Sequence, residues 1–212
     1  MIITSIQTGQ TRSITYRGRE MQTGIFKTPV DGPVFAGTFG LEGDNISDLS
    51  VHGGKDKAIY AYAADAYDAW RQLRPDDSFS PGAMGENFAV DHLPEDRIYI
   101  GDTFEAGGAV IQAVQPRLPC SKLAAKFNDP LIIRQFMTLE RPGIYFRVLK
   151  EGNIERGAVM KLIGQEDILV SVVELFLLNS RTEVNVPRLK DMLKLKTLND
   201  QWRAEITNIA GE

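Results

Sequence analysis

The sequence predicts a mainly β protein with interspersed helices (α+β), built as a closed or nearly closed β-barrel. Many short β-like segments in the first half are interrupted by glycine, and long helical patterns are few. The composition changes after about Gln165, where three short helical segments close the chain. We therefore expect a β-barrel domain over residues 1–164 and a small three-helix subdomain over residues 165–212.

Strand-sized segments begin the chain at residues 1–7, 13–17 and 21–25. A hairpin is predicted over residues 103–115, because Gly107-Gly108 separates two runs and the second is apolar enough to be buried on both faces. A further hairpin is predicted between residues 144–150 and 158–163, with its turn near Gly152 and Asn153. Such short strands are typical of a barrel.

Helical signals interrupt and then follow the strands. Asp65 and Asp129-Pro130 are typical of helix starts, and the apolar stripes that follow them are expected to face the core. The three closing helices are indicated by a capping box at Ser171 and Glu174, by Asn185-Val186-Pro187, and by Leu198, Trp202 and Ile206 at four-residue spacing. An apolar face on this tail could mediate a homodimer.

Composition excludes several classes of protein. Of 212 residues, 43% are hydrophobic and 25% charged, which argues against a disordered or fibrous chain. The net charge of −4 gives no global footprint for nucleic acid or anionic lipid. No segment has the roughly 20 apolar residues that cross a bilayer, and the N-terminus lacks a secretory pattern. We expect a soluble cytoplasmic protein that binds neither nucleic acid nor membrane.

Cys120 is the first candidate for chemistry and the only cysteine, so no internal disulfide or thiolate-rich metal site can form. Pro116 ends a strand, Pro119 fixes the backbone, and residues 121–127 are predicted to form a short helix. The helix start, Arg117 and Lys122 would favour the thiolate, which attacks electrophiles and binds soft metals. The alternative is a buried, inert cysteine.

Two glycine-rich segments are further candidates. Gly53-Gly54 followed by Lys57 suits an anion, because glycine lets backbone amides turn inward and lysine adds charge, although a surface turn with solvated lysines explains the same pattern. Glu86-Asn87 could hydrogen-bond a polar heterocycle, or simply form a turn with an exposed carboxylate.

Taken together, these segments resemble the MOSC family in order and spacing. The resemblance extends over nearly the whole chain, is strongest to the bacterial stand-alone YiiM-like subgroup, and is carried by five segments: Leu41-Glu42-Gly43-Asp44, Val51 to Ala58, Gly85-Glu86-Asn87, Gly101-Asp102 and Gln115 to Cys120. It implies a β-barrel that binds a molybdenum cofactor (molybdopterin) with Cys120 as a metal ligand. Related proteins reduce N-hydroxylated compounds, including hydroxylamino purines, to amines.

The resemblance also implies roles for the neighbouring residues. Gly53, Gly54 and Lys57 would hold an anionic group of the cofactor, and Asn87 and Arg117 would hydrogen-bond its acceptors. His52 is the first candidate for proton donation and Glu86 the second, although His52 could equally bind cofactor or brace its loop. Because no flavin or nicotinamide fingerprint is present, a separate reductase is expected to supply electrons.

Two alternatives stay open at this point. Cys120 with His52 as base could form a hydrolase or transferase, although no nucleophile elbow or protease signature surrounds the cysteine. The chain could also be a non-catalytic carrier of cofactor or sulfur.

Overall fold

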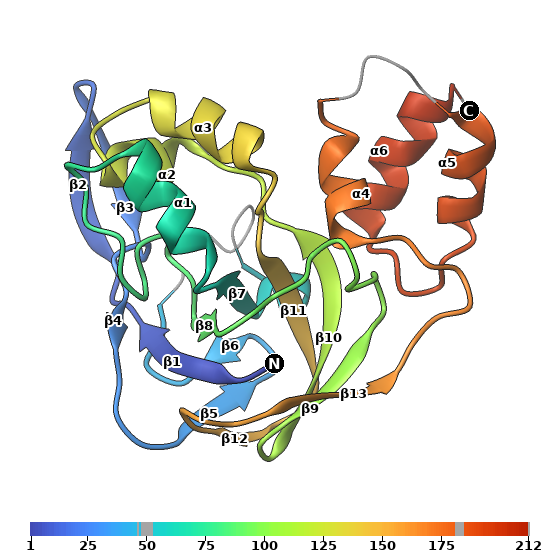
Figure 1. The fold of residues 1–212 in the computed structure, drawn as a ribbon, viewed down its shortest axis with the longest axis horizontal. Coiled ribbons are helices and arrows are strands. Elements are labelled where there is room, and N and C mark those ends of the chain that lie inside the picture. Colours follow the sequence, from blue (N-terminus) through green and yellow to red (C-terminus); the bar gives the residue numbers. More distant parts are fainter. Residues whose placement is uncertain (46, 48–52, 181–184, 212) are drawn as a thin grey trace.

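The protein is organised around one large, strongly curved sheet (Figure 1). The computed structural model describes residues 1–45, 47, 53–180 and 185–211. The strands of the large sheet lie in the order β13 (Met160–Gly164), β9 (Thr103–Ala106), β10 (Ala109–Pro116), β11 (Ile144–Lys150), β7 (Ile59–Ala63), β8 (Phe88–Val90), β1 (Ile3–Thr8) and β4 (Thr28–Pro29). All neighbours pair antiparallel except β7 and β8, which run parallel and are joined by a connection that includes helix α1 (Ala66–Leu73).

Two smaller sheets complete the β structure. Strands β12 (Gly152–Ile154), β5 (Val34–Gly37) and β6 (Gly40–Leu41) form one, and the hairpin of β2 (Arg12–Tyr16) with β3 (Arg19–Thr23) forms the other. The predicted hairpin across Gly107-Gly108 is confirmed as β9 and β10. The hairpin predicted between residues 144–150 and 158–163 is wrong, because β11 has β10 and β7 on its two edges. Gly152 and Asn153 belong to β12, which pairs with β5, and β13 pairs with β9.

The large sheet curls without becoming a closed barrel. The start of β1, the neighbour of the end strand β4, is linked to the segment just before β13: an isolated bridge pairs Ile2 with Val159, and the Ile3 amide donates to the Ala158 carbonyl at 3.0 Å. Ile3 is the first residue of β1, whereas Ile2, Ala158 and Val159 lie outside the named strands, and the pairing is an isolated bridge and not a ladder. The mainly β, mixed α+β fold is as predicted, but the barrel is a curled sheet with a short bridge across the gap.

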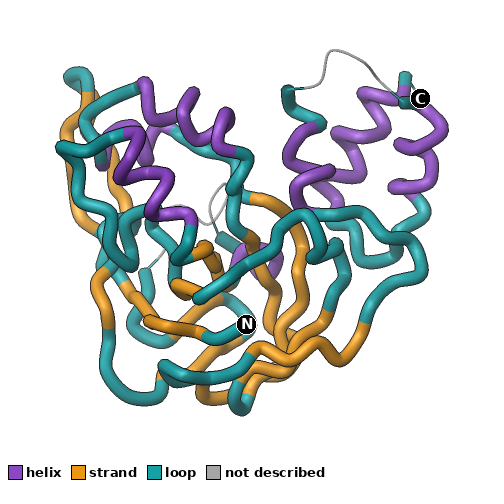
Figure 2. Tube along the Cα trace, viewed as in Figure 1, coloured by secondary structure: helices purple, strands orange, loops and turns teal. Residues whose placement is uncertain are grey.

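Helices form two groups at one rim of the sheet (Figures 1 and 2). The first group is α1, α2 (Ser121–Lys126) and α3 (Leu131–Leu139), and the second is α4 (Val172–Leu177), α5 (Val186–Leu193) and α6 (Asp200–Ala210); a short 3₁₀ helix, η1, spans Lys55–Lys57. In the second group α5 packs on α6, and α4 contacts β10. The division into domains at residue 164 remains a prediction.

Helix starts follow the sequence signals closely. The Ser171 hydroxyl accepts from the Glu174 amide at 3.0 Å, and Asn185 caps α5. The reciprocal half of the predicted capping box is wrong, because the Glu174 carboxylate pairs with Arg188 at 2.7 Å instead. Asp129 accepts from the Leu131 amide at 2.9 Å and so satisfies the first turn of α3.

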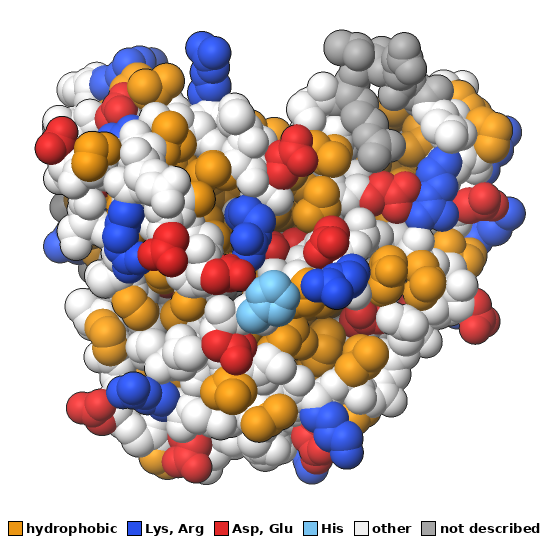
Figure 3. All heavy atoms as spheres, viewed as in Figure 1, with side chains coloured by type: hydrophobic (Ala, Val, Ile, Leu, Met, Phe, Trp, Pro, Cys, Tyr) orange, Lys and Arg blue, Asp and Glu red, His pale blue; other side chains and the backbone are white. Residues whose placement is uncertain are grey.

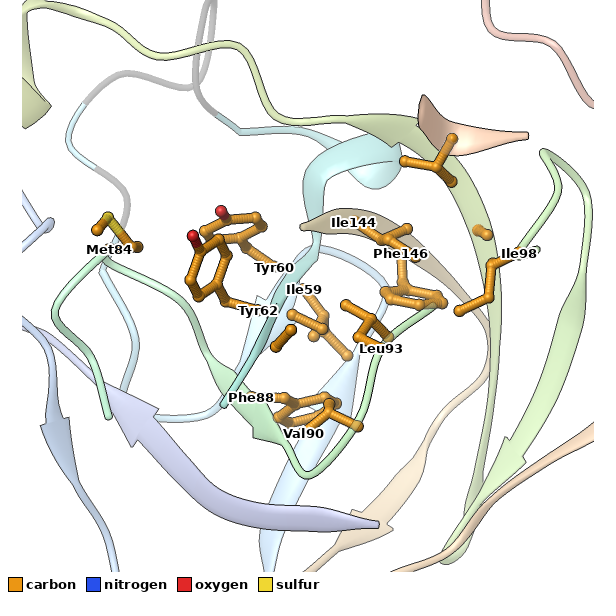
Figure 4. Close-up of a cluster of buried hydrophobic side chains, with 14 of the residues drawn as sticks. Ile59, Tyr60, Tyr62, Met84, Phe88, Val90, Leu93, Ile98, Ile144 and Phe146 are labelled. Carbon is orange, nitrogen blue, oxygen red and sulfur yellow. The ribbon is translucent and has the colours of Figure 1, made fainter. Parts of the chain in front are cut away.

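The core lies inside the curl of the sheet. Every residue of β7 is buried, and Figure 4 shows its Ile59, Tyr60 and Tyr62 beside Phe88 and Phe146 from neighbouring strands. The apolar stripes predicted after Asp65 and Asp129 also face inward, since Trp70 and Phe136 are fully buried.

The exterior carries both signs of charge. Figure 3 shows acidic and basic side chains interspersed over one face, and an indentation between the two helix groups. No helix in the described part of the chain is long and apolar enough to span a bilayer.

Candidate functional site

Cys120 lies at the end of the short connection between strand β10 and helix α2. The strand ends at Pro116, which cannot donate to the ladder, and residues 117–119 lead to Cys120. Cys120 has extended backbone angles and occupies the N-cap position, so its carbonyl accepts from the Leu123 amide at 2.9 Å. The predicted helix after Pro119 is therefore confirmed, and the half-buried thiol lies on the walls of two hollows.

The first hollow, which we call the cationic hollow, encloses about 550 Å³ with its open mouth included. It gathers side chains from segments far apart in the sequence. Four cationic side chains and one carboxylate line it together with Cys120: Lys27, Lys57, Arg117, Lys122 and Asp44. Among the described lining residues the positive side chains thus exceed the negative by three, a balance that favours an anionic ligand over a cationic one.

Arg117 is the most deeply placed of these cations. Only 5% of the residue is exposed, and its guanidinium donates to the Met84 carbonyl and lies 4.8 Å from the centroid of the Tyr60 ring. Among the described residues no carboxylate lies within salt-bridge distance of it. A permanently charged group is costly to bury, and an anion bound beside it would offset that cost.

Lys27, Asp44 and Asn87 form a connected network on another wall. Lys27 forms an ion pair with Asp44, and the Asn87 side chain donates to Asp44 at 2.8 Å and to the Gln7 carbonyl at 3.3 Å. Burial lowers the pKa of Lys27, and the adjacent Asp44 offsets part of that shift. Both amide hydrogens of Asn87 are used within the protein, so the residue positions Asp44 and has no donor left for a bound group.

Glu86, predicted as a proton donor, does not line the cationic hollow. It is fully buried, and its carboxylate accepts from the Tyr67 hydroxyl and from the backbone amides of Gly82 and Met84. The alternative of an exposed carboxylate is wrong, and the role of Glu86 as a proton donor stays a prediction. Glu86 folds the 82–86 turn upon itself, and that turn presents the Met84 carbonyl to Arg117.

Of the segment that begins with Gly53-Gly54, Lys57 is the residue that lines the cationic hollow. Gly54 has φ of +91°, a conformation that favours glycine, and its carbonyl accepts from the Lys57 amide at 3.0 Å. Lys57 lines both hollows, and burial lowers its pKa, although Asp56 acts in the opposite direction. Neither Gly53 nor Gly54 is among the described residues that line these two hollows, and His52 lies outside the described residues.

Sequence reasoning missed several members of the site. Tyr145 of β11 lines both hollows; burial raises its pKa, Arg117 opposes that shift and nearby Cys120 adds to it. Asp44 stands at the end of the Leu-Glu-Gly-Asp motif, a signal that could have placed it here. Lys27 carries no such signal, because only the folding of the 24–27 segment against the 44–45 segment brings it to the hollow.

The profile of the MOSC domain matches residues 48–161, more than half of the chain. The chain belongs to the MOSC family. Over 204 residues, which cover 95% of this chain and 91% of the relative, it is 35% identical to the uncharacterized protein YflK of Bacillus subtilis. The MOSC assignment also agrees with the fold: YiiM from Geobacillus stearothermophilus superposes with a TM-score of 0.83 at 32% identity, covering 99% of this chain and 98% of that one.

Two further relatives extend the comparison. YiiM of Escherichia coli is 35% identical over 143 residues, which cover 66% of this chain and 64% of that protein. A protein named "Reductase" from Gibberella moniliformis is 36% identical over 149 residues, which cover 69% of this chain but only 26% of that longer protein. Within this MOSC protein, Lys57, Arg117, Cys120 and Lys122 fall inside the matched domain, whereas Lys27 and Asp44 precede it.

Proposed function

We propose that this MOSC protein binds a molybdenum cofactor in the cationic hollow and reduces N-hydroxylated compounds to amines, with electrons from a separate reductase. The observation that carries the proposal is the placement of Cys120: a half-buried thiol on the wall of a hollow that holds four cations against one carboxylate. A soft sulfur donor beside concentrated positive charge suits a ligand that combines a thiophilic metal with an anionic group.

The residues present fit such a cofactor. Its phosphate would be held by the lysines, and Arg117 would meet its oxygen or ring-nitrogen acceptors, which would relieve the cost of its burial. Among the described residues no group of three or more His, Cys, Asp or Glu gathers to hold an ion. Cys120 would therefore serve as one protein ligand to a metal whose other donors belong to the cofactor.

The chemistry divides between cofactor and protein. When bound, the cofactor would supply two-electron redox chemistry at its metal. The overall reaction breaks the N–O bond, consumes two electrons and two protons, and yields an amine and water. The chain's own residues bind the cofactor, hold its orientation and deliver protons. Lys57 suits the last task, because its pKa is lowered and its side chain borders both hollows beside Cys120.

One relative favours this proposal over the alternatives. A similar stretch occurs within a longer protein named as a reductase, which supports redox chemistry. The hydrolase alternative assigns the base to His52, which lies outside the described residues, and the described histidine, His92, lies 3.0 Å from Asp65 and lines neither hollow. The carrier alternative predicts cofactor binding without turnover.

The test is a reduction assay on protein purified from a host that makes the cofactor. With reduced methyl viologen as electron source, the wild type should convert 6-hydroxylaminopurine to adenine, and Cys120→Ala should lose both activity and molybdenum. Ser121→Ala, the neighbouring position outside both hollow walls, is the control and should retain both. Molybdenum binding without amine formation would replace the reductase with a carrier; covalent acylation of a metal-free Cys120 would indicate a hydrolase.

A further inference from the structure

A second hollow lies on the other side of Cys120, between the end of β10 and the start of α6. It encloses about 570 Å³ with its mouth included and shares Cys120, Lys57 and Tyr145 with the cationic hollow. Gln115 of β10 and Gln201 and Trp202 of α6 line the remainder with Pro116, Leu118 and Pro119. We call it the helix-side hollow.

Gln115 carries an unused donor at this hollow. Only 2% of the residue is exposed, and its Oε1 accepts from the Asn199 side chain at 2.9 Å. Its Nε2 is buried and has no hydrogen-bond partner among the described residues. An unmade hydrogen bond at a buried donor costs about 1–3 kcal/mol, so the arrangement is suited to a ligand that brings an acceptor.

The walls indicate the shape and charge of that ligand. Two prolines, one leucine and two aromatic residues, Tyr145 and Trp202, are among its lining residues, and Lys57 is the one cation among the described residues of its wall, whereas the other cations of the site line the cationic hollow. Lys57 also donates to the Gln201 side chain at 3.3 Å, which ties α6 to the Cys120 end of the hollow. The helix-side hollow therefore suits an uncharged, flat molecule, in contrast to its cationic neighbour.

We infer that the helix-side hollow seats the substrate of the proposed reductase, and that Gln115 is a specificity residue that donates to a ring acceptor of a flat, uncharged N-hydroxylated compound. The inference rests on the proposed function. A molecule held there would direct its N–O group toward Cys120, the residue common to both hollows, while the cofactor occupies the cationic hollow. Helix α6 would thus contribute part of the wall that contacts the substrate.

The experiment measures equilibrium binding by calorimetry to the full-length protein as purified, with two flat probes. Adenine has ring-nitrogen acceptors and aniline has none. The wild type should bind adenine at least tenfold more tightly than aniline. Gln115→Glu keeps an oxygen that can accept from Asn199 but removes the donor, and should lose this preference. Gln112→Glu, on the same strand with its amide donating to Gly101 and Thr103 instead, should retain it.

A second variant guards against misfolding of Gln115→Glu. Gln201 is exposed in the first turn of α6, so Gln201→Trp should leave the fold intact and fill the hollow, weakening adenine binding at least tenfold. Absence of adenine binding to the wild type, or wild-type affinity for adenine in both Gln115→Glu and Gln201→Trp, would overturn the inference. Molybdenum content of the same samples separates the two proposals: Gln115-dependent adenine binding without molybdenum would refute the reductase and keep the hollow.

Discussion

At the scale of single residues, the main feature of the site is that charged side chains are buried away from solvent. Arg117 is buried under the Tyr60 ring, and burial lowers the pKa of Lys27, a shift that the adjacent Asp44 partly offsets. Burial of these charged groups lowers the stability of the folded protein when no ligand is bound, because they lose their hydration. Their burial is explained if an anionic cofactor neutralises them when bound.

Substitution of a lysine in the site should lower the cofactor content of the protein, whereas substitution of an exposed lysine nearby should not. Lys57→Met should lower the fraction of protein that carries cofactor by tenfold or more, corresponding to about 1–3 kcal/mol for a lost charged contact. Lys55→Met, two residues away on the exposed side of the same segment, is the control. Equal molybdenum and pterin content in the two variants would remove Lys57 from the site.

Lys126 gives a prediction about pH. Its ammonium donates to the carbonyls of Ile25 and Gly82, and burial lowers its pKa to about 8 despite the attraction of Glu86. Between pH 8 and the ordinary value of 10.5, the unfolded chain binds the extra proton, so this residue's contribution to the unfolding free energy rises with pH.

The wild type should therefore gain on the order of 3 kcal/mol relative to Lys126→Met as the pH rises from 7 to 10. Urea denaturation of both proteins at several pH values measures this difference, and it cancels titrations that the two share. Parallel curves over that range would contradict the assigned pKa.

At the scale of elements, two loops build the site: the 117–120 segment after β10 and the 82–86 turn, which are joined by the hydrogen bond from Arg117 to the Met84 carbonyl. The end of β10 at Pro116 sets the start of the 117–120 segment, and the Glu86-braced turn presents the Met84 carbonyl that receives Arg117. Tyr67 of α1 couples the helix to this turn by donating to Glu86. The geometry of the cationic hollow thus depends on a hydrogen bond behind it.

Removal of that hydrogen bond tests the coupling. Tyr67→Phe should lower the unfolding free energy by about 1–3 kcal/mol, because a fully buried carboxylate loses a donor. Tyr16→Phe should be close to neutral, since the Tyr16 hydroxyl has no hydrogen-bond partner among the described residues. Similar urea midpoints for the two variants would show that Glu86 does not depend on Tyr67.

Local signals were sufficient for the elements that local contacts build. The Gly107-Gly108 turn, the stop at Pro116, the helix after Pro119 and the caps at Ser171 and Asn185 are all predictable from neighbouring residues. Pairing of β11 with β10 and β7 joins residues 28 or more positions apart in the sequence, which local signals do not reveal, so the predicted hairpin is wrong. For the same reason Cys120, Arg117 and Lys57 were found in advance, whereas Lys27 and Tyr145 were not.

At the scale of the whole molecule, the fold brings one sulfur to the border of two unlike hollows. The curled sheet and the 24–27 and 44–47 segments supply the cationic hollow, and α6 supplies the wall of the helix-side hollow. Under our proposals, this arrangement would separate the place for an anionic cofactor from the place for a flat, uncharged substrate. The cytoplasmic location and a homodimer remain predictions.

The proposed need for a separate reductase is tested on the assembled protein. Cofactor-loaded protein should form adenine from 6-hydroxylaminopurine with reduced methyl viologen, and should form none with NADH alone. Turnover with NADH at a comparable rate would contradict the requirement for a partner that delivers electrons.

The central claim is that the Cys120 sulfur is a ligand to a cofactor-borne metal, and the molybdenum-to-protein ratio of Cys120→Ser tests it most directly. The comparison uses wild type and Ser121→Ala purified from the same cofactor-producing host, with folding checked by thermal denaturation. We predict molybdenum in the wild type and in Ser121→Ala, and a ratio at least tenfold lower in folded Cys120→Ser. An unchanged ratio in Cys120→Ser, or no molybdenum in any of the three proteins, would contradict the account.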